Sequence, residues 1–348
     1  MALPRWLKTR RTGAEYTPWG LNGQRTKTHQ VPERPRQRHS RLHPSSERLD
    51  WRCVRSASCT CRLVESKGHG FPVRLPARGI QRETSLTGVG LHSGQAVRLT
   101  VRPATEPGIV FVRSDLPGRP RLHLADLWLE GPAFRTTLKR GGAEVHTVEH
   151  LLSALAGLGI TDLEILLDGP ELPGLDGSPS PYAEALAAAG IATLPGRDVE
   201  AIGVDEPVSV EENGARLSIE PWSEGLAISY ELFYPGEPLA QGRCTVTVTP
   251  ETYMREIAPA RTFCLKREAE ALLAAGFGKG AGTHNTLVLE NGRALEATLR
   301  FPDEPVRHKI ADLLGDLYLL GRPLRGRLKA ERSGHRLNRL LAHRLAGR

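Results

Sequence analysis

The sequence predicts an α+β protein built from two similar units, preceded by a disordered N-terminal extension. Segments typical of strands and of helices follow one another in mixed order, without the regular alternation that builds a parallel α/β sheet. A strand-turn-strand pattern near residue 97 returns near residue 215, which is the spacing expected from duplication of one unit. Hydrophobic residues make up 39% of the chain and charged residues 25%, so a packed core is possible.

The extension, residues 1–78, differs from the rest of the chain in charge. It holds 17 Lys and Arg against 5 Asp and Glu, a balance of +12, whereas residues 79–348 hold 30 against 34, a balance of −4. The formal net charge of +8 therefore belongs to the extension. Its Arg-, Pro- and Ser-rich composition cannot bury enough apolar surface to offset the entropy of ordering.

Three interpretations of the extension stay open: a tail without a role, an organelle-targeting peptide, and a basic arm for a polyanion or an anionic membrane. The chain has no run of 18 apolar residues, so we expect no membrane-spanning helix. The five cysteines have no regular spacing and do not indicate a disulfide framework. Composition thus favours a protein of a reducing compartment.

The first unit, predicted as residues 79–197, begins with strands and continues with helices. Residues 96–101 alternate between apolar and polar side chains, and residues 109–112 are continuously apolar, so both predict strands. Residues 147–158 have helical spacing, and residues 181–189 are Ala-rich; each segment ends at a glycine, which predicts two helices.

The second unit, predicted as residues 198–348, repeats the strand pattern and adds a long helix. The turn-rich stretch 194–198 marks the expected boundary. Strands are predicted at residues 215–221 and 226–230. Residues 306–320 form an amphipathic run that ends at a glycine, which predicts a helix.

That long helix carries a first candidate for metal chemistry. His308 and Asp312 are four residues apart, so their side chains share one helical face and can reach one Zn²⁺. Asp316 continues the face by another step of four and could orient a histidine. The alternative is a charged, solvated helix face.

The pair Glu149-His150 opens the helix predicted at residues 147–158. His150 could complete an open zinc site as a third ligand, and Glu149 could take a proton from the attacking water. The alternative for this pair is a helix cap. His335, near the start of a C-terminal helix, could as a cation stabilise an oxyanion or protonate a leaving amine if a carboxylate such as Asp316 lay nearby.

Residues 146–150 also allow a second interpretation. His146-x-x-Glu149-His150 fits the H-x-x-E-H signature of inverzincin metallopeptidases, in which both histidines bind zinc. Glu224 lies at a plausible distance in the sequence to complete that site. This reading leaves His308, Asp312 and His335 without roles.

Six short motifs follow one another along residues 80–342. They are TGVGLHSG at 87–94, TVEH at 147–150, PELPGLDGS at 170–178, ARTF at 260–263, HKIADLLGD at 308–316 and SGHRLN at 333–338. Taken in order, these six motifs resemble the UDP-3-O-acyl-N-acetylglucosamine deacetylase family, the zinc amidases of lipid A biosynthesis. Six motifs in the right order are far more specific than any one of them.

The resemblance implies a role for each matching residue. The expected zinc ligands are His150, His308 and Asp312, and the expected general base is Glu149. The resemblance further implies that His335 is a cation held by Asp316, and that the hydroxyl of Thr262 donates to the tetrahedral intermediate. It implies substrate contacts by Arg261, Phe263 and Lys309.

The resemblance also implies a fold and a reaction. The expected fold places the helices of two α+β domains between two β-sheets, with an insert at residues 264–292 that forms a passage for an acyl chain. The expected reaction removes the N-acetyl group of UDP-3-O-(3-hydroxyacyl)-N-acetylglucosamine with Zn²⁺ as cofactor, giving acetate and the free 2-amine.

These implications set the expected partners and the alternatives. We expect a monomer that binds the acylated UDP-sugar and no nucleic acid, with peripheral membrane contact left open. The expected compartment is the bacterial cytoplasm, or an organelle if the extension is a targeting peptide. The alternatives are the inverzincin-type peptidase and a polyanion-binding protein acting through residues 1–78.

Overall fold

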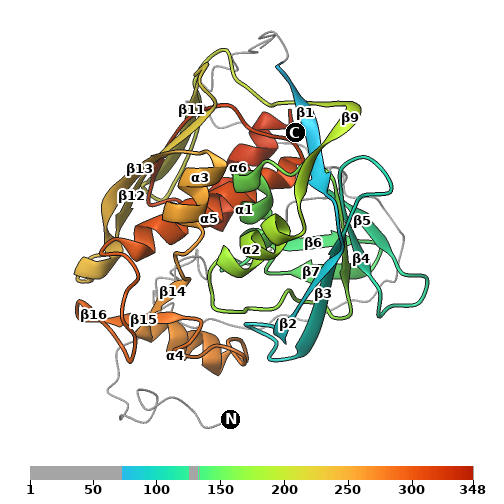
Figure 1. Cartoon of the computed structure of the whole chain (residues 1–348). Helices are drawn as coiled ribbons and strands as arrows, with labels where there is room; N and C mark the ends of the chain where they lie inside the picture. The colour runs from blue at the N-terminus through green and yellow to red at the C-terminus, as the bar shows by residue number, and fades with distance from the viewer. Residues whose placement is uncertain (1–72, 125–131, 133, 348) are drawn as a thin grey trace, which may run out of the picture.

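The computed structural model describes residues 73–124, 132 and 134–347, which form two five-stranded sheets with helices between them (Figure 1). In sheet order, the first sheet contains β2 (Thr84–Val89), β3 (Ala96–Arg102), β8 (Leu163–Leu167), β4 (Ile109–Arg113) and β5 (Arg121–His123). The second contains β10 (Val208–Glu212), β11 (Ala215–Glu220), β17 (Gly326–Glu331), β12 (Leu226–Phe233) and β13 (Gln241–Thr247).

The two sheets share one topology. In each, two antiparallel pairs come first in the chain, and a strand that follows a helix is then inserted between them. The inserted strands, β8 and β17, run parallel to β4 and β12 and antiparallel to β3 and β11. The predicted fold class, two similar α+β units with helices between two sheets, is confirmed.

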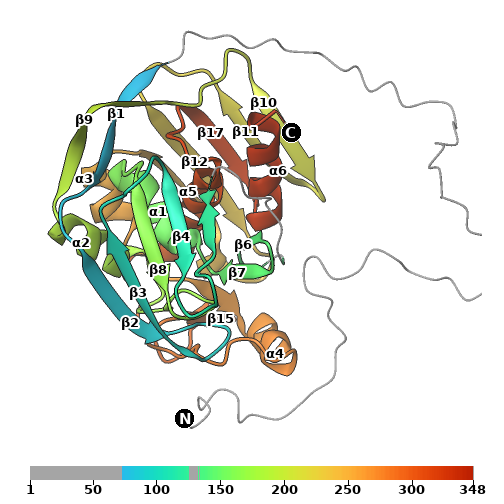
Figure 2. The ribbon, with the colours of Figure 1, turned by 90° about the vertical axis from the view of Figure 1, so that its right-hand side faces the viewer.

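The layer between the sheets contains α1 (Glu149–Leu158), α2 (Ser180–Ala188), α5 (Glu304–Leu317) and α6 (His335–Leu345). Figure 2 shows α1 and α5 between the sheets. Nine of the ten residues of α1 are buried. The two helices approach so closely that a Cβ at Gly315 would lie 2.0 Å from the carbonyl oxygen of Glu149. Glycine is therefore required at this crossing.

Most predicted elements are present with shifted ends. The strands predicted at 96–101 and 109–112 correspond to β3 and β4, and those predicted at 215–221 and 226–230 to β11 and β12. The helix predicted from residue 147 begins at Glu149 instead, because Thr147 has a left-handed backbone with φ of 57°. The helix predicted at 306–320 ends at Leu317 and continues as the 3₁₀ turn Tyr318–Leu320.

The N-terminal boundary differs from the prediction. Residues 74–78, assigned to the extension, belong to β1 (Arg74–Ile80), which pairs with β9 (Ile191–Glu200). The turn predicted at 194–198 lies inside β9, where the register with β1 shifts. Pairing with a strand distant in the sequence orders these residues, which local composition cannot reveal. The rest of the extension lies outside the described residues, and the domain boundary near residue 197 stays a prediction.

Smaller elements complete the chain. The hairpin of β6 (Thr137–Arg140) and β7 (Ala143–His146) precedes α1. Between β13 and α5 lie α3 (Pro250–Thr252), a π-helical turn (Tyr253–Ile257), β14 (Phe263–Leu265), α4 (Lys266–Ala274), β15 (Leu287–Glu290) and β16 (Arg293–Ala294). The predicted insert, 264–292, corresponds to most of the small sheet β14-β15-β16 with α4. Among the described residues, no helix has both the length and the apolar character needed to cross a membrane.

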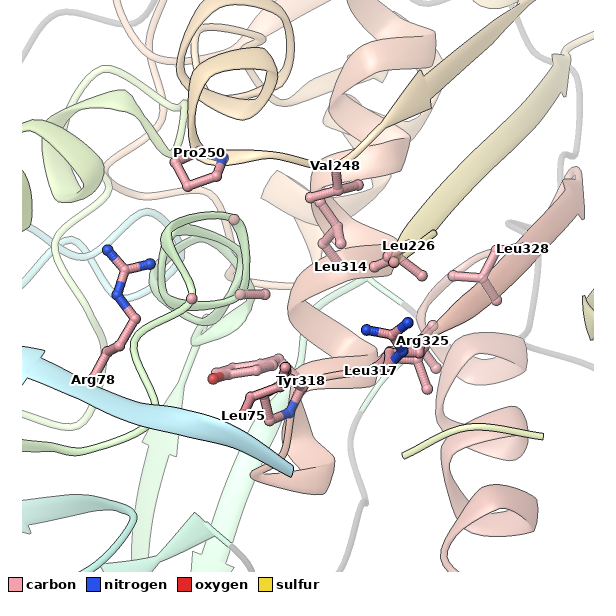
Figure 3. A pocket seen from close by; sticks show the side chains of 16 residues that line it. Leu75, Arg78, Leu226, Val248, Pro250, Leu314, Leu317, Tyr318, Arg325 and Leu328 are labelled. Carbon is pink, nitrogen blue, oxygen red and sulfur yellow. The ribbon is translucent and has the colours of Figure 1, made fainter. Parts of the chain in front are cut away.

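A cavity of about 200 Å³ lies between β1, the C-terminal ends of α1 and α5, and the second sheet (Figure 3). Its lining is mainly apolar and includes Leu75, Leu226 and Leu314, with Arg78 and Arg325 as the charged members. None of the predicted site residues lines it, so the chemistry lies elsewhere.

Candidate active site

Three buried side chains from α1 and α5 form a candidate metal site. Nitrogen or oxygen atoms of His150, His308 and Asp312 all lie within 4.8 Å of one another, and this is the one such group among the described residues. One carboxylate oxygen of Asp312, Oδ1, lies 3.3 Å from Nε2 of His308 and 3.9 Å from Nε2 of His150. The three ligand atoms therefore converge on one point.

Hydrogen bonds and charges around the three side chains prepare them to bind a metal. Nδ1 of His308 lies 3.0 Å from the carbonyl oxygen of Ala260, so it donates there and leaves Nε2 free to ligate. Burial, with a contribution from His308, lowers the pKa of His150 to about 3 and keeps it neutral. Burial alone would raise the pKa of Asp312, but Lys309 and His308 outweigh it and hold that pKa well below its ordinary value.

These donors fit zinc. Two imidazoles and one carboxylate are a usual protein contribution to a catalytic zinc site, which keeps a further position for water or substrate. Nζ of Lys309 donates to the other oxygen of Asp312, Oδ2, at 2.6 Å, so the Oδ1 that faces the two histidines is not engaged by the lysine.

Glu149 lies beside this group as the first residue of α1. Its side chain is buried, and its Oε2 accepts a hydrogen bond of 3.1 Å from the backbone N–H of Thr136. Burial, with the charges of Asp316 and Asp312, raises the pKa of Glu149 to about 7, while His335 acts in the opposite direction. A carboxyl group in this environment can accept and release a proton near neutral pH.

The N-terminus of α1 depends on a strained residue. Thr147 is β-branched and has a positive φ, which is an unfavourable backbone conformation for such a side chain. Two hydrogen bonds hold it: its N–H donates to Thr136 at 2.9 Å, and its hydroxyl donates to Glu171 at 2.9 Å. The chain thereby turns from β7 into the helix that carries Glu149 and His150.

A histidine-carboxylate pair, His335 with Asp316, lies near the metal group. Nδ1 of His335, the first residue of α6, is 2.8 Å from Oδ2 of Asp316, and Nδ2 of Asn338 donates to the same oxygen at 2.8 Å. Nε2 of His335 lies 3.8 Å from Oδ2 of Asp312. Burial would lower the pKa of His335, but Asp316 and Asp312 outweigh it and raise that pKa, which favours the imidazolium.

The remaining predicted site residues lie at the start of β14 and in α5. Thr262 and Phe263 are half-buried, and the ring of Phe263 meets that of Tyr234 edge-on at 6.0 Å between centroids. The guanidinium of Arg261 pairs with the buried Glu304 at 2.9 Å, and the predicted substrate contact by Arg261 stays a prediction.

The structure does not bring together the residues of the peptidase alternative. His146 ends β7, and its Nδ1 lies 3.1 Å from the hydroxyl of Thr137 rather than with the metal group. Glu224 is exposed on the turn between β11 and β12. The metal group uses only His150 of the H-x-x-E-H signature.

From the sequence we assigned no role to Asn338 and Thr136, which donate hydrogen bonds to carboxylates of the site. Asn338 was part of a matching motif, and its spacing of three from His335 on one helix could have indicated a shared partner. Thr136 carried no signal at all, because its partners are 13 and 180 residues away in the chain.

The arrangement defines a class of enzyme before any comparison with known proteins. Two imidazoles and one carboxylate leave a metal open to water, and a carboxyl group that exchanges a proton near neutral pH lies beside them. Near them lies the imidazole of His335, whose pKa Asp316 and Asp312 raise, which favours the cation. Such a site belongs to a mononuclear zinc hydrolase.

Comparison with known proteins narrows this class to one family. Residues 77–347 match the family model for UDP-3-O-acyl N-acetylglycosamine deacetylase. UDP-3-O-acyl-N-acetylglucosamine deacetylases of Anaeromyxobacter dehalogenans and Acidithiobacillus ferrooxidans are each 40% identical to this chain, over 275 and 265 residues. These matches cover 77% and 74% of this chain and 86% of each relative, and that of Thermodesulfovibrio yellowstonii is 38% identical over 259 residues. The chain belongs to the UDP-3-O-acyl-N-acetylglucosamine deacetylase family, whose members are zinc-dependent amide hydrolases.

Proposed function

We propose that this protein hydrolyses the acetamide of UDP-3-O-(3-hydroxyacyl)-N-acetylglucosamine to acetate and the free 2-amine, a step of lipid A biosynthesis. The observation that carries the proposal is the convergence of His150, His308 and Asp312 beside Glu149 and His335, in a chain that matches the deacetylase family over residues 77–347. The substrate is that of the family.

His150, His308 and Asp312 would hold the zinc ion through Nε2, Nε2 and Oδ1. When bound in such a site, zinc acidifies water and polarises a carbonyl oxygen. Lys309 fixes the carboxylate of Asp312 from its other oxygen, so the ligand cannot rotate freely. Its ammonium also lies close enough to the site to contact polar groups of the substrate.

Glu149 acts as the general base. Its carboxylate accepts a proton from the attacking water, whose oxygen forms a bond to the acetamide carbon. The backbone N–H of Thr136 holds one oxygen of Glu149 in place, which leaves the other oxygen for the proton. A pKa raised toward neutral pH makes the protonated form a usable acid in the next step.

His335 stabilises the negative charge that develops on the carbonyl oxygen, and the hydroxyl of Thr262 donates to the same oxygen. The carbon–nitrogen bond then breaks, and the amine takes up a proton from Glu149 or from His335. Asp316 keeps the imidazolium charged and oriented. Phe263 contacts the sugar, and Arg261 holds the segment before β14 through its pair with Glu304.

The acylated UDP-sugar is the proposed partner, and the bacterial cytoplasm is the proposed compartment. The compartment is that of the deacetylase family. The formal charge of residues 79–348 is −4, which gives no electrostatic reason to expect a nucleic-acid partner.

The test is deacetylation by the full chain, measured as acetate and free amine formed in equal amounts from the acylated UDP-sugar. We expect activity that a chelator abolishes and zinc restores. His308→Ala should lose both bound zinc and activity, whereas His146→Ala should keep both because His146 lies outside the metal group. A zinc-loaded chain that releases no acetate would refute the proposal, and loss of zinc in His146→Ala would point to the peptidase alternative.

A further inference from the structure

Thr136 contacts two groups that act in the proposed reaction: the base Glu149, and the Asp316 carboxylate that pairs with His335. It directly precedes β6 and is fully buried. Its carbonyl oxygen accepts a hydrogen bond of 2.9 Å from the N–H of Thr147, the strained residue before α1. The β6–β7 hairpin therefore fixes the backbone of Thr136 in place.

From this fixed position, Thr136 donates to two carboxylates that belong to different helices. Its backbone N–H donates to Oε2 of Glu149 on α1 at 3.1 Å, and its hydroxyl donates to Oδ1 of Asp316 on α5 at 2.5 Å. Both carboxylates are buried, at 3% and 0% exposure, so neither can exchange these bonds for bulk water.

The hydrogen bond from the Thr136 hydroxyl holds the carboxylate of Asp316 in its orientation. Among the described residues, the hydrogen bonds to this carboxylate come from three side chains, and only Thr136 donates to Oδ1, while His335 and Asn338 both use Oδ2. Without the hydroxyl, one buried carboxylate oxygen loses its partner, which is costly for an ionised group. The carboxylate can then rotate, and His335 loses its fixed direction.

We propose that Thr136 is a positioning residue that sets the geometry of the base and of the histidine-carboxylate pair relative to each other. Its backbone orients Glu149, and its hydroxyl orients Asp316 and through it His335. Because one residue fixes both, the distance between the proton acceptor and the cationic imidazole is tied to the hairpin. Thr136 itself does not touch the reacting atoms, and this inference rests on the proposed deacetylation.

The test replaces the hydroxyl with a methyl group of similar size in Thr136→Val, in the full chain loaded with zinc. We expect kcat to fall about tenfold or more, the effect of one hydrogen bond to a charged group, with KM changed much less. Thr136→Ser restores the hydroxyl and should recover most of kcat. Thr137→Val is the matched control, because it removes the neighbouring hydroxyl, whose partner is His146, outside the machinery.

A second measurement follows the pair directly. In chains labelled with ¹⁵N-histidine, the Nδ1 proton of His335, assigned with His335→Gln, should shift and exchange faster in Thr136→Val than in Thr137→Val. A Thr136→Val enzyme with kcat within about twofold of the parent would overturn the inference, and so would a lower kcat with an unchanged His335 signal. If Thr136→Val does not fold, Thr136→Ala makes the same test.

The two proposals fail separately. A parent chain without deacetylation counts against the proposed function, whereas the His335 signal still decides whether Thr136 positions the pair. An active parent whose valine variant behaves like the control leaves the function intact and removes the role of Thr136.

Discussion

Glu149 illustrates at the scale of one residue how burial makes a common side chain reactive. It lies on a buried helix start with two aspartates near it, and all three influences raise its pKa. Its carboxylate is nevertheless not one of the three converging ligands. Its chemistry can therefore be separated from metal binding by mutation.

We predict that Glu149→Gln lowers kcat about 10²- to 10⁴-fold, the usual contribution of a general base. Bound zinc should stay at the parent level, because His150, His308 and Asp312 are unchanged. Acetate release and metal analysis of the same sample measure the two effects. Glu144→Gln on β7 is the control, since that side chain pairs with Lys139 away from the site. Loss of zinc in Glu149→Gln would show that Glu149 is a ligand instead.

The residues of the site differ in how far the sequence alone predicts their contacts. The pairing of His308 with Asp312 follows from a spacing of four on one helix, which fixes a shared face. The proximity of Glu149 to Asp316 does not follow from any spacing in the sequence, because two separate helices and the hairpin before α1 bring them together. Thr147 shows the same limit, since two hydrogen bonds that hold its left-handed backbone come from Thr136 and Glu171, which are not its neighbours in the sequence.

At the scale of the element, the crossing of α1 and α5 carries the site. The two helices meet at Gly315, three residues after the ligand Asp312, and the contact atom on the other helix is the carbonyl of Glu149. The closeness of this crossing sets how near the ligands of α5 come to the ligand and base of α1.

We predict that Gly315→Ala destabilises the protein by about 1–3 kcal/mol, the usual cost of overpacking. Alanine alone would favour a helix over glycine, so the sign of the effect separates the crossing from local propensity. Urea unfolding measures it, with Gly203→Ala as the control because a Cβ there meets nothing within 4 Å. An unchanged or raised stability of Gly315→Ala would contradict the tight crossing.

The first sheet offers a pH test at the same scale. Glu164 on β8 is buried, and Arg102 on β3 and Arg121 on β5 both donate to it. Burial would raise the pKa of Glu164, but these two bonds outweigh it and lower the pKa below its ordinary 4.5. Because the unfolded chain then binds the proton more readily, the stabilisation is complete above that ordinary value and is lost as the pH falls.

We therefore predict that Glu164→Gln costs about 1 kcal/mol at about pH 7 and clearly less at about pH 4. The partly exposed arginines keep the effect small. The free energy of unfolding in urea at both pH values measures it, with the exposed Glu184→Gln on α2 as the control. An equal cost at both pH values would mean that the loss is one of packing.

At the scale of the whole molecule, the sequence predicted the duplication because strand alternation is a local signal. The strands that repeat, β3 with β4 and β11 with β12, were visible, and so was the helix that follows each pair of hairpins. The strands that join the units were not, because β1 is ordered by β9, more than 110 residues away. The pairing of distant segments, rather than local composition, therefore orders residues 74–80.

β1 is the first strand among the described residues, and its contacts lead to a truncation test. β1 pairs along β9, and the backbone carbonyl of its Arg78 accepts a hydrogen bond from the N–H of Thr161. The guanidinium of Arg78 donates to the carbonyl of Leu158 at the end of α1. We predict that removing residues 1–72 leaves both deacetylation and the melting temperature near those of the full chain. Removing residues 1–80 should lower the melting temperature by several degrees, since β9 and the end of α1 lose their partners. Equal melting of the two truncated chains would show that β1 contributes nothing to the fold, and lost activity in the shorter truncation would give residues 1–72 a role in the reaction.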